Sequence, residues 1–225
     1  LPIFSQDPFM IRTFREGKDI HAAVASKVFH VPEGEVTPEM RRRAKVINFG
    51  ILYGMGVTAL KQNLGTDRKE AQIFHDNYFA EFPTIAGYLE SVKEEARTKG
   101  FTTTLFGRRR YFPDIKSRIP FIRAAAERMA INAPIQGTAT ADLVKLAIRD
   151  IDRALVHATT KSKVKLLMQI HDELVYEVDD AYVKDFTHLA AECMANVIPP
   201  EFLSGKESVP LATGIGIGAN YGALK

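Results

Sequence analysis

The sequence predicts an α+β fold, with helices along the first half of the chain and an antiparallel β-hairpin packed on long helices in the second half. Helix start and stop signals follow one another between Asp19 and Gly100. Apolar and polar residues then alternate from Val164 to Ile170, which is typical of a half-buried strand. With 46% hydrophobic and 25% charged residues, the 225-residue chain can bury a sizeable core.

Capping residues indicate where the helices of the first half begin. Asp19 can accept hydrogen bonds from the free amides of a helix that runs to about Phe29. Thr37-Pro38-Glu39 joins a hydroxyl cap, a proline at the first helical position and an acid beside the helix dipole, and predicts a helix over residues 38–54. Further helices are predicted over 57–64, over 67–82 and from a Thr84 cap to about Lys99.

The rest of the chain is predicted to alternate between hairpins and helices. Two short strands around Phe106-Gly107 form a first hairpin, over 101–105 and 108–112. A helix over 121–133 is expected to bend at Pro134 and to resume from Ala139 to about His157. The remaining predicted elements are a hairpin of strands 164–170 and 174–178, a helix from Asp179-Asp180 to about Val197, and a last strand over 211–217.

The predicted helix 38–54 carries one chemically ordered face. Side chains four residues apart lie on the same face of a helix. Four residues have that spacing here: Arg41, Lys45, Phe49 and Tyr53. Cations suit phosphates and aromatic rings suit a base or a sugar, so the face has the chemical order of a nucleoside triphosphate. A solvated basic turn followed by a packed aromatic pair is the alternative interpretation.

Polar groups elsewhere are candidates for binding nucleic acid or metal. Arg108-Arg109-Arg110 follows a tight turn and is either a solvated face or a grip on a phosphate backbone. Arg128, Asn132 and Gln136 form a polar stripe that either faces a ligand or satisfies its own hydrogen bonds. His171-Asp172-Glu173 lies at a hairpin tip between apolar strands, where a buried charge usually requires a cation or a function.

The charge distribution and the cysteine content narrow the possible partners. The net charge is +3, and the first 121 residues are basic whereas the remainder is mildly acidic. A basic half suits a polyanion and an acidic half can hold a cation. The single Cys193 excludes an internal disulfide and a cysteine-based zinc site. No apolar run is long enough to span a bilayer, so we expect no membrane partner and a cytoplasmic location.

Several separate stretches resemble the motifs of family A DNA polymerases, the bacterial DNA polymerase I type, in the same order. They are Lys18-Asp19-Ile20-His21, the helix from Arg41 to Gly54, Thr104 to Arg110, Ala126-Glu127-Arg128, Ile131 to Ala139, and His171 to Val175. The terminal Gly218-Ala219-Asn220-Tyr221 is also similar, although the family commonly has Trp where this chain has Tyr221. The resemblance covers essentially the whole chain.

The resemblance implies a division of the chain and an activity. Residues 1–121 would form the helical fingers subdomain, with its dNTP-binding helix over 38–54, and residues 122–225 the C-terminal part of the palm. The family catalyses template-directed DNA synthesis in replication and repair. A nucleotidyl group passes from a dNTP to a primer 3′-OH, and pyrophosphate leaves. Two Mg²⁺ ions in the intact enzyme and primer-template DNA would be the cofactor and the partner.

The resemblance also implies roles for individual residues. Arg41 and Lys45, helped by His21, would hold the dNTP phosphates, and Phe49 and Tyr53 would flank the sugar and the base. The catalytic set would be Lys45, Asp172 and Arg41, with Asp172 as a Mg²⁺ ligand and Glu173 as a second candidate ligand. The residues implied in DNA binding are Arg108, Arg109, Arg110, Arg128, Asn132, Gln136 and His171. Donors in the minor groove sense correct pairing without reading sequence, which a copying enzyme requires.

One expected element of the family is not found in the sequence. The other metal-binding Asp of the family lies in a strand motif, whereas Leu1 to Asp7 resembles the helix that follows that strand, so Asp7 is not its substitute. We therefore expect that the motif, the thumb and the remaining palm lie upstream in the same polymerase, and that this chain alone is inactive. Two alternatives remain: a non-catalytic nucleic-acid-binding module derived from a polymerase, and a single-subunit RNA polymerase relative.

Overall fold

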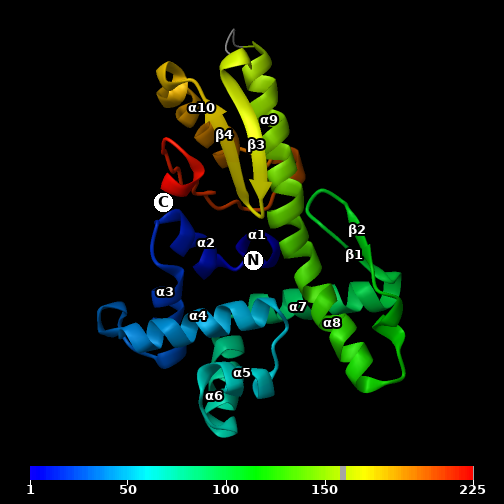
Figure 1. Cartoon of the computed structure of the whole chain (residues 1–225). Coiled ribbons are helices and arrows are strands. Elements are labelled where there is room, and N and C mark those ends of the chain that lie inside the picture. Colours follow the sequence, from blue (N-terminus) through cyan, green and yellow to red (C-terminus); the bar gives the residue numbers. More distant parts are fainter. Residues whose placement is uncertain (158–160, 225) are drawn as a thin grey trace. The chain divides into compact units, whose positions relative to one another are not determined.

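The computed structural model describes residues 1–157 and 161–224, and it confirms the α+β class (Figure 1). The chain divides into two compact units. The first comprises Leu1–Gly137 with Gly205–Val209, and the second comprises Thr138–Ser204 with Pro210–Lys225. The predicted boundary after residue 121 concerns polymerase subdomains and stays a prediction.

The first unit is mainly helical. Its helices are α1 (Pro2–Ser5), α2 (Pro8–Arg15), α3 (Ile20–Phe29), α4 (Pro38–Leu52), α5 (Val57–Leu64), α6 (Arg68–Glu81), α7 (Pro83–Lys99) and α8 (Pro120–Gln136). The predicted caps of α3 and α4 are confirmed, because Asp19 accepts from the amides of His21 and Ala22 and Thr37 accepts from that of Met40. The left-handed Gly65 ends α5 as predicted.

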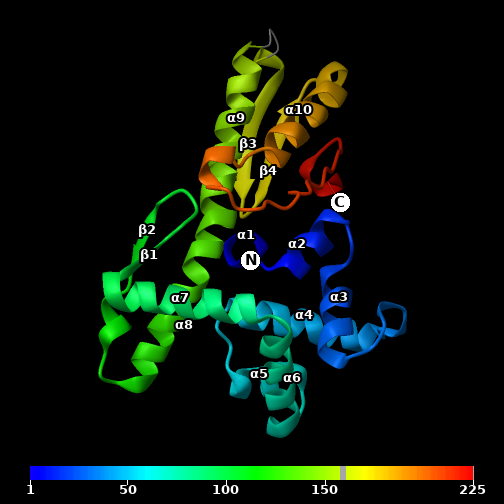
Figure 2. The ribbon, with the colours of Figure 1, turned by 180° about the vertical axis from the view of Figure 1, so that it is seen from behind.

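The core of the first unit is built from the helices that surround α4. Ile47 of α4 and Val24 of α3 are fully buried together with Tyr78, Phe82 and Ile85, which lie at and between the ends of α6 and α7. Burying each of these large side chains contributes roughly 1.5–3 kcal/mol. Seen from behind, α5 and α6 lie side by side below α4 (Figure 2). The core therefore fixes the inner face of α4 and leaves its outer face to solvent.

The first predicted hairpin is confirmed, with shorter strands. Strand β1 (Phe101–Thr103) pairs antiparallel with β2 (Arg109–Tyr111) around the left-handed Gly107. Phe112 and Ile115, which follow β2, pack with small side chains of α7 and α8 in a second core. The hairpin is thereby held against α8.

The predicted cap of α7 is wrong. The helix begins one residue earlier, with Pro83 at its first position, and the Thr84 hydroxyl instead donates to Asp7 Oδ2. Pro83 needs no capping partner for an amide hydrogen that it lacks, which explains the earlier start. Segment 205–209 joins this unit because Gln6 and the Glu207 backbone exchange hydrogen bonds and Arg15 pairs with Glu207.

The predicted end of the helix at Ala133 is also wrong. Helix α8 continues through Pro134 to Gln136, and a π-helical segment, Gly137–Asp142, leads into α9 (Leu143–His157). Ala133 and Pro134 are buried. Their burial offsets the single backbone hydrogen bond that an internal proline removes.

The second unit contains the second predicted hairpin, which is confirmed. Strand β3 (Val164–Ile170) pairs antiparallel with β4 (Glu173–Val178), and α10 (Val183–Ala195) follows a 3₁₀ turn capped by Asp179. Figures 1 and 2 show α9 and α10 beside the hairpin. Ile151 and Leu155 of α9, Val164 of β3 and Phe186 of α10 form the core of this unit.

The expected alternation along β3 is interrupted. The register shifts between Leu166 and Met168, so that Leu167 is an extra residue in the strand. Leu166, Leu167 and Met168 are exposed in this chain, at 43%, 53% and 39%. The predicted alternation is therefore wrong from Leu167 onward, and α9 and α10 cover only part of the hairpin.

The predicted last strand over 211–217 is also wrong, because that segment has no regular secondary structure. Within 1–157 and 161–224, β3 and β4 pair only with each other, so no neighbouring strand completes a ladder with it. Gly214 and Gly216 further weaken its tendency to form a strand. No helix among the described residues is long and apolar enough to cross a membrane.

Candidate nucleotide site and nucleic-acid interface

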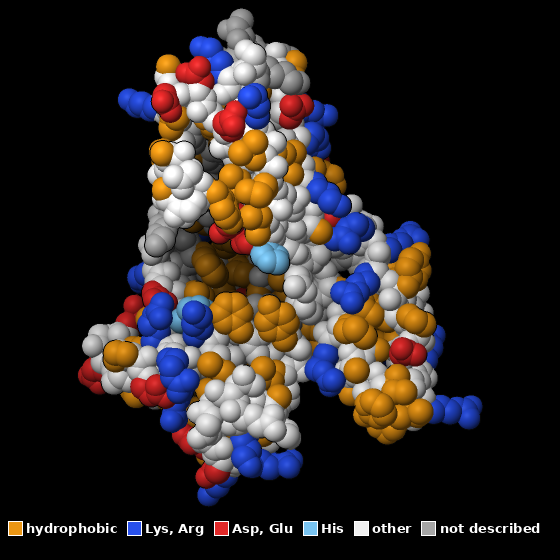
Figure 3. Space-filling view, viewed as in Figure 1, with side chains coloured by type: hydrophobic (Ala, Val, Ile, Leu, Met, Phe, Trp, Pro, Cys, Tyr) orange, Lys and Arg blue, Asp and Glu red, His pale blue; other side chains and the backbone are white. Residues whose placement is uncertain are grey.

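Helix α4 presents the predicted face to solvent. Ala44, Ile47 and Ile51 on its inner side are buried, which turns the opposite side outward. Phe49 and Tyr53, which are four residues apart, are 45% and 51% exposed. Figure 3 shows Lys and Arg side chains over one end of α4 and exposed hydrophobic side chains over the other. The two rings are therefore not buried in the core of the unit.

His21 of α3 and Arg41, Lys45 and Phe49 of α4 lie together, as the sequence predicts. The ring of His21 is 5.8 Å from that of Phe49, centroid to centroid. The Lys45 ammonium lies 6.0 Å from the Phe49 centroid, and Arg41 Nε is 2.7 Å from Asp19 Oδ2. Two cations and a histidine thus adjoin an exposed ring, an arrangement that suits an anion attached to a flat group.

The other two arginines at the start of α4 are held elsewhere. Arg42 and Arg43 both pair with Glu39 in the first turn, and Arg43 also reaches Glu70 of α6. Arg41 therefore differs from its neighbours, because its partner is Asp19, whose carboxylate also accepts from the His21 amide.

Asn48 is a residue of this site that the sequence reasoning missed. Its Nδ2 lies 3.2 Å from His21 Nδ1, and the residue is only 8% exposed. Burial lowers the pKa of His21, Asp19 acts in the opposite direction, and Arg41 and Lys45 add to the lowering. The lowered pKa favours the neutral form of the ring. The sequence does give one indication of this role. Asn48 is a polar residue that lies off the face of Arg41, Lys45, Phe49 and Tyr53, where an apolar core residue would be expected.

The end of α4 meets α8 at Gly54 and Arg128. Gly54 adopts a left-handed conformation, with φ of 63°. A Cβ atom on it would lie 2.8 Å from Arg128 Cγ and 3.2 Å from Arg128 Cα. Glycine is thus required twice, for its backbone conformation and for the close approach. This contact brings Arg128 next to the residue that follows Tyr53.

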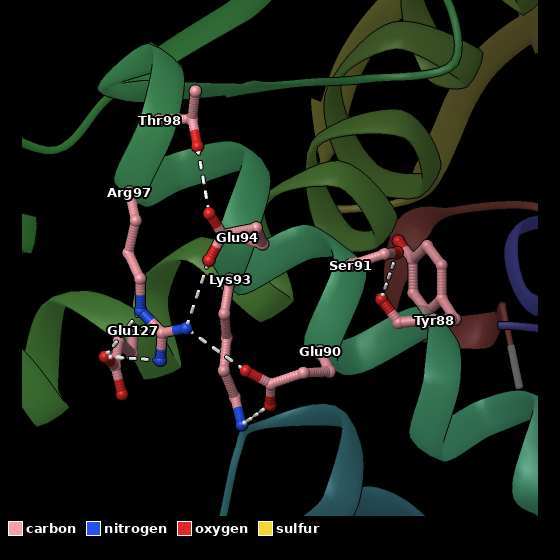
Figure 4. Close-up of polar contacts among 8 residues, drawn as sticks. All are labelled: Tyr88, Glu90, Ser91, Lys93, Glu94, Arg97, Thr98 and Glu127. Atoms are coloured by element: carbon pink, nitrogen blue, oxygen red, sulfur yellow. Dashed lines mark hydrogen bonds and ion pairs between the residues drawn. The ribbon is translucent and has the colours of Figure 1, made fainter.

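Helix α8 carries the predicted polar stripe. Asn132 Nδ2 donates to Gln136 Oε1 at 2.7 Å, and Arg128 is exposed. Arg97 of α7 holds this helix through Glu127 at 3.0 Å, while also pairing with Glu90 and Glu94 of its own helix (Figure 4). Two members of the stripe, Asn132 and Gln136, are thus hydrogen-bonded to each other, and its side chains remain accessible on one face of α8.

The arginine triplet is exposed, but its members have structural contacts. Arg108 donates to the Gly137 carbonyl oxygen at 3.0 Å. Arg109 lies over the Phe101 ring at 4.8 Å, and Arg110 lies over the Phe112 ring at 5.6 Å. These contacts orient the guanidinium groups without removing them from solvent.

The candidate metal ligands lie at the tip of the β3–β4 hairpin. His171, Asp172 and Glu173 are exposed, and His171 has a left-handed backbone with φ of 52°. The two-residue turn between Ile170 and Glu173 places Asp172 at the end of the strands. Among the described residues, no group of three His, Cys, Asp or Glu side chains is arranged to hold a metal. Asp7 is 3% exposed and caps α2 by accepting from the Met10 amide, a structural role.

The chain is similar to known DNA polymerases over nearly its whole length. Residues 1–223 match the profile of DNA polymerase family A. The chain is 45% identical over 217 residues to a thermostable DNA polymerase I of Thermus filiformis, and 44% identical over 221 residues to that of Thermus aquaticus. It is 44% identical over 194 residues to DNA polymerase I of Geobacillus stearothermophilus. These alignments cover 96%, 98% and 86% of the chain but only 25%, 25% and 22% of the relatives.

A solved structure is similar over nearly the whole chain. The POL domain of Pol1 from M. smegmatis, in complex with DNA primer-template and dNTP, superposes with a TM-score of 0.88 at 39% identity. The similarity covers 99% of this chain and 38% of that one.

Proposed function

Since the chain belongs to DNA polymerase family A, we propose that it carries the nucleotide-binding helix and part of the catalytic centre for template-directed DNA synthesis. The primer 3′-OH attacks the α-phosphate of a dNTP, a new phosphodiester bond forms, and the bond to the leaving pyrophosphate breaks. The chain spans about a quarter of the length of its relatives, so the activity is that of a longer protein.

The observation that carries this proposal is the ordered outer face of α4. We assign Arg41 and Lys45, with His21, to the triphosphate, because cations next to phosphates neutralise charge as it moves to the leaving group. Lys45 is the proposed proton donor to the pyrophosphate. Phe49 and Tyr53 are proposed to flank the sugar and the base, since both rings are exposed where the cations end.

A Mg²⁺ site at the hairpin tip fits the donor chemistry in part. Asp172 and Glu173 offer exposed carboxylates, and Mg²⁺ in proteins is commonly bound by one or two carboxylates together with substrate phosphates. We propose Asp172 as a ligand and Glu173 as a second candidate. Bound Mg²⁺ would activate the attacking hydroxyl and stabilise the leaving oxygen, as it does in two-metal sites. A second carboxylate segment is proposed to come from the rest of the polymerase.

The DNA side of the proposal uses residues of both units. Arg128, Asn132 and Gln136 of α8 and His171 of the hairpin are proposed to contact the primer end and the minor groove. Arg108-Arg109-Arg110 is proposed to contact phosphates, since its guanidinium groups stay exposed. The substrates imply action in the cytoplasm, at the nucleoid if the organism is bacterial.

Primer extension by the intact polymerase tests the proposal. We expect incorporation of dNTPs, little incorporation of NTPs, and no extension by the 225-residue chain alone. Preference for NTPs would favour a single-subunit RNA polymerase. Primer-template binding by the intact protein without extension would favour a non-catalytic module.

A further inference from the structure

Asn48 lies on α4 and faces His21 of α3, not the exposed stripe. It is more than nine-tenths buried, and its Nδ2 approaches His21 Nδ1 to 3.2 Å. An amide nitrogen can only donate a hydrogen bond, so Nδ1 of the imidazole accepts. In a neutral imidazole the single proton then resides on Nε2.

Packing alone does not account for an amide at this position. Asn48 Oδ1 is buried and has no hydrogen-bond partner among the residues that the structure describes. An apolar side chain of similar size would leave no unpaired oxygen there, and burying such an oxygen is unfavourable. The contact with His21 is therefore the feature that distinguishes asparagine from leucine at residue 48.

The surroundings of His21 favour the neutral form of its ring and orient it. Burial lowers the pKa of the imidazole, the Asp19 carboxylate opposes this, and Arg41 and Lys45 reinforce it. The tilted Phe49 ring, at 5.8 Å, packs beside the imidazole. A neutral ring presents a donor to an anion only if the proton is on the nitrogen that points away from Asn48.

We propose that Asn48 is a positioning residue that holds His21 in the tautomer with the proton on Nε2, so that the ring donates a hydrogen bond to an anionic oxygen of the triphosphate. This inference rests on the proposed function, because it concerns the same nucleotide site. It adds a determinant of nucleotide affinity that does not itself contact the substrate.

The tautomer can be read directly from the chain labelled with ¹⁵N-histidine. Long-range ¹H–¹⁵N correlation spectra distinguish a protonated from an unprotonated ring nitrogen, and a His21→Gln variant identifies the signals of His21. We expect Nδ1 to be unprotonated and Nε2 to carry the proton at neutral pH. A proton on Nδ1 would overturn the proposal without any variant of Asn48.

An isosteric variant at residue 48 exchanges the donor and the acceptor in the hydrogen bond with His21 Nδ1. Asn48→Asp keeps the size of the side chain but can only accept, so the proton should move to Nδ1 of His21. Gln62→Glu adds the same charge on the exposed side of α5 and is the control. In the intact polymerase, Asn48→Asp should raise the KM for dNTP by about tenfold or more, since a hydrogen bond to a charged group is lost.

The outcomes separate this inference from the proposed function. A raised KM together with a moved proton supports the positioning role, provided that Gln62→Glu changes neither. A raised KM with an unchanged tautomer overturns the positioning role and leaves the polymerase proposal intact. Failure of the intact wild-type protein to use dNTPs rejects the proposed function, whatever the tautomer of His21.

Discussion

Arg41 forms an ion pair with Asp19, the residue that caps α3, with 2.7 Å between Nε and Oδ2. The carboxylate thus has two tasks, because its other oxygen accepts from the amides of His21 and Ala22. Burial tends to raise the pKa of Asp19, but the bonds to Arg41 and to the helix amides outweigh it and lower the pKa. An incoming phosphate would compete with Asp19 for the guanidinium of Arg41.

The two tasks of Asp19 can be separated by substitution. Asp19→Asn keeps a good cap but removes the charge, so we expect the KM for dNTP to fall by up to about fivefold, since exposed ion pairs contribute about 0.2–1 kcal/mol. Asp19→Ala also loses the cap and should lower the free energy of unfolding by about 1 kcal/mol. Urea unfolding and steady-state extension measure both effects. Equal stability of the two variants would contradict the capping role.

Removal of the Lys45 ammonium tests the triphosphate assignment. In the full-length polymerase, Lys45→Ala should lower kcat/KM for dNTP incorporation by about 10- to 100-fold or more, because a charged hydrogen bond contributes about 1.5–3 kcal/mol. Lys61→Ala, on the exposed last turn of α5, is the matched control. Near-normal extension by Lys45→Ala would refute the assignment.

Removal of one carboxylate tests the metal assignment. Asp172→Asn in the full-length polymerase should abolish Mg²⁺-dependent extension, since an amide is a much weaker ligand for a hard cation. Asp185→Asn, exposed in the first turn of α10, should extend primers normally. Glu173→Gln decides the role of its neighbour, and a loss comparable to that of Asp172→Asn would make it a ligand as well. Full activity of Asp172→Asn would exclude the site.

Two left-handed glycines form a matched pair for testing the contact between α4 and α8. Gly54 and Gly65 have φ of 63° and 65°, but only Gly54 would place a Cβ against Arg128. Both alanine variants carry the backbone cost of roughly 1–2 kcal/mol, whereas Gly54→Ala should destabilise by at least about 1 kcal/mol more. Thermal unfolding of the two variants measures the difference. Equal unfolding temperatures would mean that Arg128 can move aside freely.

The burial of His21 predicts a pH effect on stability. Its pKa in the folded state lies below the ordinary value of 6.5, so the unfolded chain binds more protons as the pH falls through that value. Stability from this group is therefore complete above pH 6.5 and declines as the pH falls toward the folded pKa. His21→Gln should remove this part of the decline. The urea midpoint, measured at several pH values for both proteins, tests the prediction, and parallel curves would contradict it.

The features that the sequence predicts well depend on neighbouring residues in the chain. Asp19 and Thr37 accept hydrogen bonds from amides two or three residues away. The starts of α3 and α4 can therefore be predicted without knowledge of the tertiary structure. The outer face of α4 is likewise a matter of helical spacing. The turn between β3 and β4 also depends on the residues next to it.

The features that the sequence analysis missed depend on distant partners. Thr84 resembles a cap, yet its hydroxyl donates to Asp7, the residue that caps α2. The contact of Asn48 with His21 and that of Gly54 with Arg128 join different helices. Segment 211–217 has the composition of a strand, but a strand forms only where a neighbouring edge accepts its hydrogen bonds.

The extra residue Leu167 in β3 determines which face of the hairpin each following side chain points to, relative to strict alternation along the sequence. In a strand, successive side chains point to opposite faces, so one additional residue exchanges the faces that alternation assigns to everything that follows it. Met168, Gln169 and Ile170 therefore point to the faces opposite to those that alternation from Leu166 would give them. Deleting Leu167 would make Leu166 and Met168 consecutive opposite Tyr176 and Val175, so the ladder would become regular and the strand that leads to the turn His171-Asp172 would keep its faces. The hairpin can therefore lose this one residue without a change in the pairing of the residues next to the turn.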